Sequence, residues 1–581
     1  MTVARFLSVL QDRLRANRER VLVRIFESRS EDEPVELTGA GILEESAALV
    51  ARFCRSPRQR VTLLLLPHSR ELFLLHLGLV LQGRIPAILA WPTSRIDPEK
   101  YQRNLLHQLR NLPAAELLTL PGLARNLAPG LPYPVRAVET KYAGEFDRNF
   151  AVPLTVDPVE RGPEPAGAPE GALFLQFSGG TTGAQKCVVV TAEMLHSQFE
   201  RLGECLQFGE GDGVASWLPL YHDMGLIACL WFPLWHGAPS VQISAADWLM
   251  DPAMLFRAVA RYQATFCWLP NFAFSYLAGQ RVRMREEHGL GRMRAWINCS
   301  EPVRLRSMNA FAETFQDWGV RPNALQASYA MAENVFAVTQ TALGTVPSTF
   351  PRGKLVQSAL QLNRNAYDIV DEVYVSSGRA LKEMEVRVRG PSGANCAEAE
   401  PGGIEIRSQC LFRGYWGTGG FTTTAILEDG WYATGDFGFF ANDELYVIGR
   451  TKDIVIVGGQ NLFPEDVEAL VNKTEGVYPG RVVAFGVQDE EQGTESLAVV
   501  AELRGGYERD TAVRLERDVS KSIIAAMGVA ARYVWVVPER WIVKSTAGKI
   551  SRRETRNRFS SELRAGRGES AGVTATVEQR L

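Results

Sequence analysis

Residues 173 to 190 of the chain read LFLQFSGGTTGAQKCVVV. Two apolar runs, Leu173–Phe177 and Cys187–Val190, flank a loop rich in glycine, serine and threonine, Ser178–Lys186. Short apolar runs bounded by turn residues are typical of buried strands, so we expect a strand, a loop and a second strand. Backbone N–H groups, hydroxyls and one lysine in such a loop can surround phosphate oxygens. A simple surface hairpin is the alternative interpretation.

The loop is not a P-loop of the Walker A type. Lys186 is followed by Cys187 and then by β-branched residues, whereas that motif requires Ser or Thr and a helix. A second basic, glycine-containing loop lies near the end of the chain, at Lys544–Arg552, and presents Lys549. Two loops suited to phosphate at opposite ends of one chain suggest a nucleotide that is handled by two domains.

Composition limits the class of protein. A chain of 581 residues is too long for one ordinary core, so two or more domains are expected. Its 63 basic and 66 acidic residues give a net charge of −3, which favours neither a nucleic-acid partner nor an anionic membrane. The eight cysteines form no C-x-x-C pair and are typical of buried thiols in a reducing compartment. We expect a cytoplasmic enzyme without membrane insertion.

The first 150 residues alternate between strand-like and helix-like patterns. Val61–Leu66 is expected to be a buried strand, Arg70–Gln82 an apolar-faced helix and Ile85–Ala90 a second strand. This βαβ order predicts a parallel sheet covered by helices, and hence an α/β fold. Residues 156–171 are rich in proline and glycine and are expected to connect elements. The polar tail after residue 560 is expected to be disordered.

Five segments, in the same order along the chain, resemble the motifs of the adenylate-forming superfamily. That superfamily contains acyl-CoA synthetases, luciferases and the adenylation domains of peptide synthetases. The segments are its phosphate loop (Ser178–Lys186), its aromatic-x-x-x-Glu motif (Tyr329–Glu333), its T-G-D motif (Tyr432–Asp436), its G-R-x-x-D hinge (Gly449–Asp453) and its terminal lysine loop (Gly548–Lys549). Five ordered motifs over most of the chain make the resemblance specific.

Within the superfamily, three segments look most like the fatty acyl-AMP ligases: Ser216–Leu226, Pro270–Phe274 and Asn298–Val303. These ligases also carry an extra segment before a Ser-x-Gly-Arg turn, and residues 346–371 precede Ser377-Gly378-Arg379 here. The resemblance implies that a fatty or related apolar acid becomes an acyl-AMP. It further implies delivery to the phosphopantetheine arm of an acyl carrier protein in a polyketide or peptide synthase system.

The resemblance also implies a two-domain architecture. A large N-terminal domain of sheets packed with helices, residues 1–449, would bind ATP and the acyl group. A small, mobile C-terminal α/β domain, residues 450–581, would carry the lysine loop, and Lys452 would act as the hinge. A few boundary residues can absorb the backbone rotation that such a movement requires.

ATP and Mg²⁺ are the implied cofactors. Lys549 would bridge the acid's carboxylate and the α-phosphate, Glu333 would bind Mg²⁺, and Asp436 would accept hydrogen bonds from the ribose hydroxyls. Arg450 would lie near ribose or phosphate, with a salt bridge at the domain boundary as the alternative. Further residues are expected to contact the nucleotide, among them a tyrosine that would stack on adenine: Ser178, Gly179, Gly180, Thr181, Thr182, Gly183, Lys186, Ser300, Glu301, Pro302, Ser328, Tyr329, Ala330, Met331 and Ala332.

His222 is expected beside the acyl carboxylate, although a lone histidine is more often part of a core. Most candidates for acyl contacts are apolar, and each could be ordinary core; they lie in or next to the ligase-like segments and are Trp217, Met224, Gly225, Trp268, Asn271, Phe272 and Tyr276. The stretch Trp268–Ala278 contains no aspartate. An amino-acid-activating domain would need one there to hold an ammonium group, so an uncharged acyl chain is favoured.

The phosphate loop departs from the family pattern, which usually has Ser, Pro and Gly where Gly179, Gln185 and Cys187 stand. Two alternatives to the acyl-AMP ligase therefore stay open, namely an acyl-CoA ligase and a catalytically weak relative that binds acyl groups or nucleotides. The presence of Lys549, Glu333, Asp436 and Arg450 favours an active enzyme.

Overall fold

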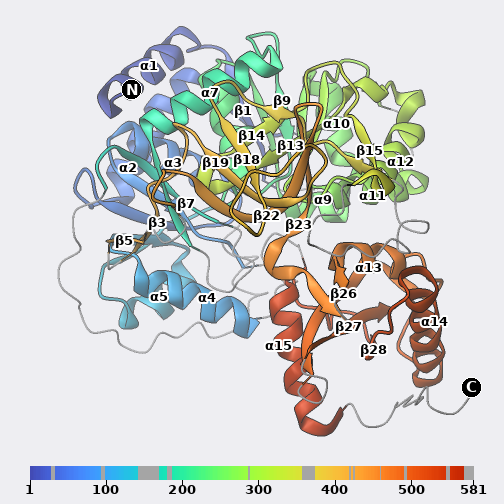
Figure 1. The fold of residues 1–581 in the computed structure, drawn as a ribbon. Helices are drawn as coiled ribbons and strands as arrows, with labels where there is room; N and C mark the ends of the chain where they lie inside the picture. Colours follow the sequence, from blue (N-terminus) through green and yellow to red (C-terminus); the bar gives the residue numbers. More distant parts are fainter. Residues whose placement is uncertain are drawn as a thin grey trace, which may run out of the picture. The chain divides into compact units, whose positions relative to one another are not determined.

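The structure is a computed structural model. It describes residues 1–27, 33–92, 98–141, 169–178, 186–284, 288–355, 373–417, 420–422, 426–457, 460–489, 494–544 and 550–567. Contacts divide the chain into two units. The larger holds the described residues up to Phe350 and those of Val373–Ile448, and the smaller holds residues 351–355 and the described residues from Gly449 onward. The α/β class, with a large sheet-rich N-terminal part and a smaller C-terminal part, is confirmed (Figure 1).

One sheet of the larger unit has nine strands in the order β17-β14-β13-β12-β11-β9-β10-β1-β2. Its centre is parallel, from β13 to β1, whereas the edge strands β2, β14 and β17 pair antiparallel. The bounds are β17 Arg379–Ala380, β14 Ala337–Gln340, β13 Leu325–Ala330, β12 Ala295–Cys299, β11 Phe266–Leu269, β9 Val214–Ser216, β10 Ser240–Ile243, β1 Val21–Phe26 and β2 Val35–Thr38.

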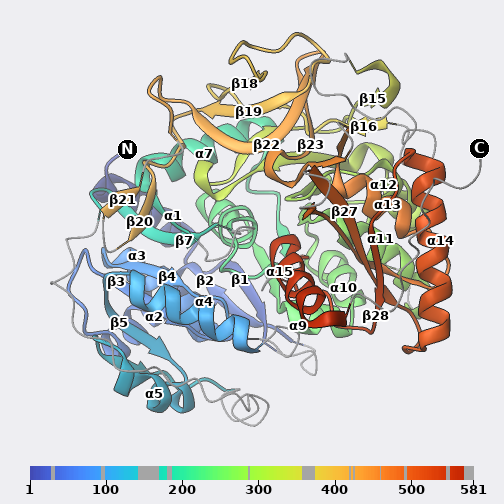
Figure 2. The ribbon, with the colours of Figure 1, turned by 60° about the horizontal axis from the view of Figure 1, so that its bottom comes forward.

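A second sheet has eight strands in the order β21-β20-β8-β7-β4-β3-β5-β6. The bounds are β21 Gly420–Thr422, β20 Tyr415–Gly417, β8 Cys187–Thr191, β7 Ala172–Phe177, β4 Ile85–Ile88, β3 Val61–Leu65, β5 Ala114–Thr119 and β6 Val135–Ala137. The predicted βαβ unit is confirmed, since β3 and β4 pair in parallel through α3, Arg70–Leu81. Figure 2 shows β3, β4 and β5 side by side.

The helices of the larger unit begin where the sequence provides caps. The Ser69 hydroxyl accepts a hydrogen bond from the Leu72 amide at the start of α3, and the Thr191 hydroxyl accepts one from the Met194 amide at the start of α7. Such caps satisfy backbone donors that have no partner within the helix. Besides α3, the α-helices described in this unit are α1 Val3–Ala16, α2 Gly39–Phe53, α4 Pro98–Asn111, α5 Pro121–Leu127, α7 Ala192–Leu206, α8 Phe232–Trp235, α9 Ala245–Met250, α10 Ala253–Tyr262, α11 Asn271–Gln280 and α12 Leu305–Phe315.

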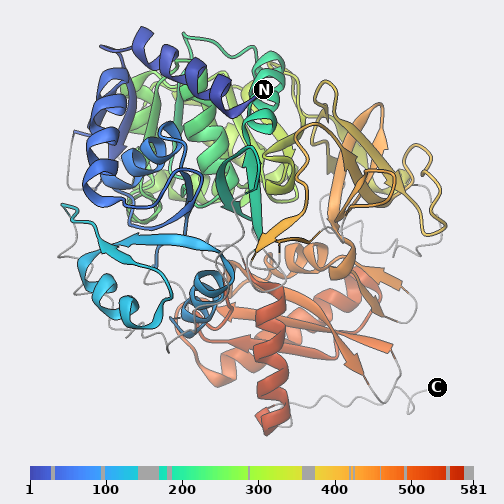
Figure 3. The same ribbon diagram turned by 90° about the vertical axis from the view of Figure 1, so that its left-hand side faces the viewer.

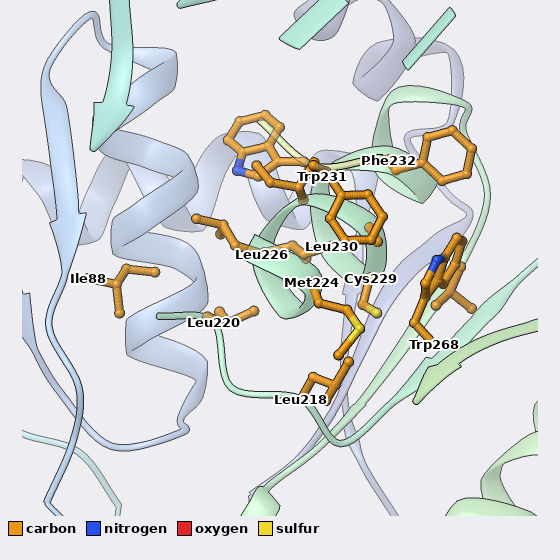
Figure 4. Close-up of a cluster of buried hydrophobic side chains, with 14 of the residues drawn as sticks. Ile88, Leu218, Leu220, Met224, Leu226, Cys229, Leu230, Trp231, Phe232 and Trp268 are labelled. Atoms are coloured by element: carbon orange, nitrogen blue, oxygen red, sulfur yellow. The ribbon is translucent and has the colours of Figure 1, made fainter. Parts of the chain in front are cut away.

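A buried π-helix, η2 (Met224–Trp231), crosses the core of the larger unit. All eight of its residues are buried, and it leads directly into α8. Figure 4 shows Met224, Cys229 and Trp231 of this helix among the apolar side chains of neighbouring elements. π-helical turns are rare and often occur at functional sites, so a functional site is expected beside this helix.

A third sheet of the larger unit is antiparallel, in the order β18-β19-β22-β23. The strands are β18 Glu385–Arg389, β19 Gly402–Arg407, β22 Tyr432–Ala441 and β23 Glu444–Arg450. The last of these ends at the boundary between the units, because Gly449 and Arg450 are grouped with the smaller one. The predicted domain roles and the hinge at Lys452 stay predictions.

The smaller unit is built on a three-stranded sheet, β26-β27-β28. Alternate residues of β26 face opposite sides, as the two-residue period of a strand requires. Val482 and Ala484 belong to one apolar cluster, whereas Val483 and Phe485 belong to another. The elements are β24 Val455–Val457, β25 Gln460–Leu462, α13 Pro464–Val471, β26 Val477–Asp489, β27 Thr494–Leu503, α14 Arg509–Met527, β28 Tyr533–Val537 and α15 Arg552–Glu562. Figure 3 shows the red α15 against the orange strands of this unit.

The polar tail begins later than predicted. Residues 560–562 complete α15, and Leu563–Arg567 continue as a further helical turn, η10. The reason is that Phe559 is fully buried and Leu563 packs against the same apolar cluster, which anchors the end of the helix. Residues 568–581 lie outside the described part.

Residues 351–355, at the start of the predicted insertion, belong to the smaller unit. Arg352 lies in a short helix, η7 (Arg352–Lys354), and its guanidinium forms a buried ion pair with Asp466 of α13 at 2.8 Å. Just before it, β15 (Thr349–Pro351) pairs with β16 (Val373–Val375). Residues 356–371 of the predicted insertion lie outside the described residues. In the described part of the chain, no helix is both long and apolar enough to span a bilayer.

Candidate nucleotide and acyl site

The predicted strand–loop–strand is present. β7 and β8 pair antiparallel, with Phe177 opposite Cys187, and the Ser178 amide donates a hydrogen bond to the Lys186 carbonyl at 2.9 Å. Ser178 is buried and Lys186 is exposed, so the two ends of the loop face different environments. Five residues predicted to contact phosphate lie outside the described residues: Gly179, Gly180, Thr181, Thr182 and Gly183.

Tyr415, at the start of β20, connects Lys186 with Glu333. Its hydroxyl donates to a Glu333 carboxylate oxygen at 2.6 Å, and the Lys186 ammonium lies 4.4 Å from the centre of its ring. Burial, followed by the neighbouring Glu333 charge, raises the pKa of the Tyr415 phenol, so the proton stays on it. Sequence reasoning missed Tyr415, because a tyrosine beside Trp416 gives no local sign of a contact with residues so distant in the chain.

Glu333 lies in a tight turn, η6 (Ala332–Asn334), just after β13. The Gln176 side-chain amide donates to the carbonyls of Ala332 and Val335 at 3.1 and 3.2 Å, and thereby fastens this turn to β7. Val335 has a φ of 63°, which is strained for a β-branched residue. The turn that presents the predicted metal ligand is therefore held in an unfavourable backbone conformation by buried contacts.

The structure brings Tyr329 and Asp436 together from two different sheets. The Tyr329 hydroxyl, on β13, donates to a carboxylate oxygen of Asp436, on β22, at 2.6 Å. The amide of Asp436 in turn donates to the Thr434 hydroxyl at 3.0 Å. Ser328, next to Tyr329, is buried, and its hydroxyl donates to the Thr339 carbonyl. The adenine and ribose contacts of this pair stay predictions.

The predicted adenine turn follows β12. Ser300 has a φ of 71°, a left-handed conformation that turns the chain sharply. A Glu301 carboxylate oxygen accepts a hydrogen bond from the Phe272 amide at 2.9 Å, so it satisfies a donor in the first turn of α11. The Ser300 hydroxyl approaches the Met224 sulfur at 3.8 Å. The residues predicted for adenine and for the acyl group therefore touch.

His222 and Gly225 lie at the start of the π-helix. The His222 carbonyl accepts from the Leu226 amide at 2.8 Å, and its ring nitrogen lies 3.8 Å from the Asp223 carboxylate. A Cβ atom at Gly225 would come within 2.3 Å of the Pro219 carbonyl oxygen. Close backbone packing is thus sufficient to explain the glycine, whether or not it touches an acyl chain.

Three of the predicted acyl residues form an aromatic cluster with a tryptophan that sequence reasoning missed, Trp248. The ring of Trp217 stacks on that of Trp248 at 3.8 Å with an interplanar angle of 3°. Phe272 lies edge-on to Trp217, and Tyr276 lies beside Trp248. Among the described residues, the indole N–H groups of Trp217 and Trp248 have no hydrogen-bond partner. No motif contains Trp248, so only tertiary packing reveals it.

Trp268 and Asn271 have other surroundings. Trp268 is fully buried and packs against Phe232 and Phe336, which is a core environment (Figure 4 shows it near Phe232). The Asn271 side-chain oxygen accepts from the Asn298 side-chain amide at 2.9 Å and from the Arg304 amide at 3.0 Å. Asn271 therefore joins α11 to β12 and to the segment after it.

Lys549 lies outside the described residues, but both ends of its loop are described. Lys544 and Ile550 form an antiparallel bridge, and the Ser551 amide donates to the Val543 carbonyl at 2.8 Å. Arg450 ends β23, and Lys452 lies in the short helix η9 (Thr451–Asp453).

Arg552 joins the end of the lysine loop to the rest of the smaller unit. Its guanidinium pairs with the carboxylates of Asp453 at 2.9 Å, Glu468 at 2.9 Å and Glu465 at 3.1 Å. It also donates to the Ala484 carbonyl at 2.9 Å. Burial raises the pKa of Glu468, although the Arg552 charge opposes the shift. We call these four charged side chains the Arg552 cluster.

Comparison with known proteins agrees with this geometry. Residues 19–416 match the family model described as AMP-binding enzyme. The long-chain-fatty-acid–AMP ligase FadD26 of Mycobacterium marinum is 29% identical over 87% of this chain and 88% of its own. The corresponding ligase FadD32 of Mycolicibacterium smegmatis is 27% identical over 93% and 92%.

A solved structure from studies of fatty acyl-adenylate ligases of E. coli and L. pneumophila has the same fold. Its TM-score is 0.77 at 20% identity, and the match covers 96% of this chain and 98% of that one. Because the family model covers more than half of the sequence, the chain belongs to the family of AMP-binding enzymes.

Proposed function

We propose that this protein activates a fatty carboxylic acid with ATP, releases pyrophosphate and transfers the acyl group to the phosphopantetheine thiol of an acyl carrier protein. Membership of the AMP-binding family and the fatty-acid–AMP ligases among its relatives support the substrate class. The observation that carries the proposal is the clustering of Lys186 with Glu333 and of Tyr329 with Asp436. A reducing cytoplasm suits its eight free cysteines.

In the first step, a carboxylate oxygen attacks the α-phosphorus of ATP. A P–O bond forms to the acid, and the P–O bond to the β-phosphate breaks, so that pyrophosphate leaves with the electron pair. Negative charge spreads over the phosphoryl oxygens, and catalysis consists mainly of positioning and electrostatic stabilisation. Lys186 and Lys549 would supply positive charge, Tyr329 would stack on adenine, and Asp436 would orient the ribose.

The residues present fit Mg²⁺. Mg²⁺ prefers oxygen ligands and is commonly held by one or two carboxylates together with substrate phosphates and water. Glu333 offers a half-buried carboxylate, one oxygen of which already accepts from Tyr415. When bound, the ion would neutralise phosphate charge. The part played by the chain is to hold Glu333 in its turn through Gln176.

In the second step, the phosphopantetheine thiol attacks the acyl carbonyl; a C–S bond forms, the C–O bond to AMP breaks, and AMP leaves. We infer that the small domain rotates about Lys452 between the steps and withdraws Lys549. The segment 346–371 would hinder free coenzyme A, whereas a carrier protein would contribute binding energy from its own surface.

The test offers the enzyme a panel of acids with ATP and Mg²⁺, and measures pyrophosphate exchange together with mass spectra of the products. We expect acyl-AMP with fatty acids, and acylated product with a holo carrier protein but not with coenzyme A. Efficient acyl-CoA synthesis would instead assign the protein to the CoA ligases. The absence of acid-dependent exchange would indicate a binding protein without catalysis.

A further inference from the structure

We propose that Trp248 is a positioning residue that sets the chain length of the acid: by supporting Trp217 it closes the far end of the acyl site to all but medium-length fatty acids. The assignment rests on the proposed function and names the class of fatty acid that the site accepts. Trp248 lies in α9 and belongs to none of the motifs. It would act on the substrate through Trp217, the ring on which it stacks.

The strand order of the nine-stranded sheet indicates where a ligand lies. Strand β9 is followed in the chain by β10, which pairs on one side of it, whereas β11 pairs on its other side and is followed by β12. In a parallel α/β sheet, ligands bind at the carboxyl ends of the strands where the direction of the connections reverses in this way. Trp217 comes directly after β9, and Phe272 lies in the first turn of α11, which follows β11. Both side chains therefore belong to the edge of the sheet at which a ligand is expected.

The residues predicted for the nucleotide and for the acyl group form a row along this edge. Across the sheet, the strands follow one another in the order β12, β11, β9 and β10. The residues that come after these strands are, in the same order, Ser300, Phe272, Trp217 and Trp248. An acid whose carboxylate is activated near Ser300 would therefore extend its chain across Phe272 towards the two indole rings.

Trp248 limits the extension of a chain in this direction. Its ring stacks on that of Trp217 at 3.8 Å with an interplanar angle of 3°, which is van der Waals contact and leaves no room for a hydrocarbon chain between them. The exposed fraction falls along the row, since Phe272 is half-buried, Trp217 is 4% exposed and Trp248 is 0% exposed. A chain that passes Phe272 therefore meets closed packing at the two tryptophans.

The neighbouring elements hold Trp248 in place. Only Ser244 separates β10 from α9; its hydroxyl accepts from the Asp247 amide at 3.2 Å, and its carbonyl accepts from the Trp248 amide at 3.0 Å. On α11, the Tyr276 ring lies 5.3 Å from that of Trp248, and its hydroxyl donates to the Leu249 carbonyl at 3.2 Å. The indole pair is therefore a fixed wall at the carboxyl end of β9 and β10.

The spacing of the strands gives the length that this wall allows. Neighbouring strands lie about 4.8 Å apart, so the three steps from β12 to β10 span about 14 Å. Consecutive Cα atoms are about 3.8 Å and three bonds apart, so an extended chain advances about 1.3 Å per bond. A span of about 14 Å therefore accommodates on the order of ten carbons.

The test measures kcat/KM of acid-dependent pyrophosphate exchange for octanoic, decanoic, dodecanoic and hexadecanoic acids, each below its critical micelle concentration. Wild type should prefer decanoic to hexadecanoic acid by about tenfold or more, as expected for a hydrophobic pocket that excludes additional methylene groups. Trp248→Leu should raise the ratio of hexadecanoic to decanoic acid by about tenfold, which corresponds to the burial of about two more methylene groups. Trp248→Phe keeps a ring against Trp217 and should leave the ratio close to that of wild type.

Trp296→Leu provides the matched control. Trp296 is also fully buried in the larger unit, but its ring packs against Phe256 and Phe311. This variant should leave the ratio unchanged, and a ratio of activities does not depend on the fraction of protein that folds. The inference would be overturned by a wild type that uses hexadecanoic acid as well as decanoic acid, by an unchanged ratio in Trp248→Leu, or by an equal shift in Trp296→Leu.

Calorimetric titration of the same acids separates the role of Trp248 from the proposed function, because binding requires no adenylation. Wild type should bind decanoic acid more tightly than hexadecanoic acid, and Trp248→Leu should lose this preference. If these affinities are found while no acid supports exchange, only the proposed function fails. Exchange with acids of every length would count only against Trp248, and binding of neither acid would overturn both.

Discussion

The candidate nucleotide site of the larger unit and the Arg552 cluster of the smaller unit place opposite charges in contrasting surroundings. In the first, one tyrosine, Tyr415, contacts both Lys186 and Glu333. In the second, Arg552 is surrounded by three carboxylates at 2.9 to 3.1 Å. In the candidate site the two opposite charges contact the ring and the hydroxyl of a neutral phenol, whereas in the cluster the opposite charges contact each other directly. Four predictions test this contrast.

The largest effect is expected from Arg552→Met, which removes the cation of the Arg552 cluster. The substitution leaves the carboxylates of Asp453, Glu465 and Glu468 without their cation in a buried place. Loss of one partner of a buried ion pair typically costs about 3–5 kcal/mol. Chemical unfolding should show this loss in the free energy of unfolding of the smaller unit. Arg552→Lys should recover part of it, and equal stability of all three proteins would show that the cluster is not structural.

A comparable effect, but on rate rather than stability, is expected from Lys549→Ala. Removal of a preorganised charge at a reacting phosphoryl group typically raises the barrier by about 3–4 kcal/mol. Acid-dependent pyrophosphate exchange should therefore fall by about 10²–10³-fold, while ATP affinity and the unfolding temperature stay near wild type. Near-normal exchange would mean that this loop takes no part in adenylation.

A smaller effect is expected from Tyr329→Phe in the candidate nucleotide site. The variant keeps a ring for stacking but loses the 2.6 Å hydrogen bond to Asp436. Hydrogen bonds to charged groups are worth about 1.5–3 kcal/mol, so the KM for ATP should rise by about 10- to 150-fold with a smaller change in kcat. If kcat falls instead and KM is unchanged, the contact acts on chemistry rather than on nucleotide binding. Steady-state kinetics at saturating acid provides the measurement.

The most gradual effect concerns the pH dependence of the free energy of unfolding. The pKa of Glu468 is raised in the folded state from its ordinary value of 4.5 to about 7, first by burial, so the folded protein binds more protons than the unfolded one between these values. Its contribution to stability is therefore present below pH 4.5 and is lost as pH rises towards 7, by at most about 1.4 kcal/mol per pH unit. The free energy of unfolding, measured at several pH values, should change with pH differently in Glu468→Gln and in wild type across this window. The same dependence on pH in both proteins would contradict the raised pKa.

The sequence predicted those parts of the fold that depend on local pattern. The strands around the phosphate loop and the unit β3-α3-β4 follow from short apolar runs separated by turn residues, and the structure has them at nearly the expected bounds. Disorder was expected from residue 560, whereas helical structure continues to Arg567, because the polar sequence there contains two apolar residues that pack against the smaller unit, Phe559 and Leu563.

The candidate site was predictable only where a motif marks it. Tyr329, Glu333 and Asp436 are signalled by their neighbours in sequence, but their partners are chosen by the tertiary fold. Tyr415 reaches Lys186 because β20 pairs with β8, and Trp248 meets Trp217 through stacking. Neither contact could be predicted from the periodicity of the sequence, because each joins residues from two different elements.

The backbone of Val335 has a consequence for how the larger unit can change. Conformations of this kind cost about 1–3 kcal/mol, and a glycine there would release that cost. The same glycine would slacken the turn that presents Glu333, because fewer steric limits would define it. A substitution selected for heat resistance at this position would therefore be expected to reduce metal-dependent activity. At Val335, one φ angle therefore affects both the stability of the protein and the position of Glu333, and it affects them in opposite directions.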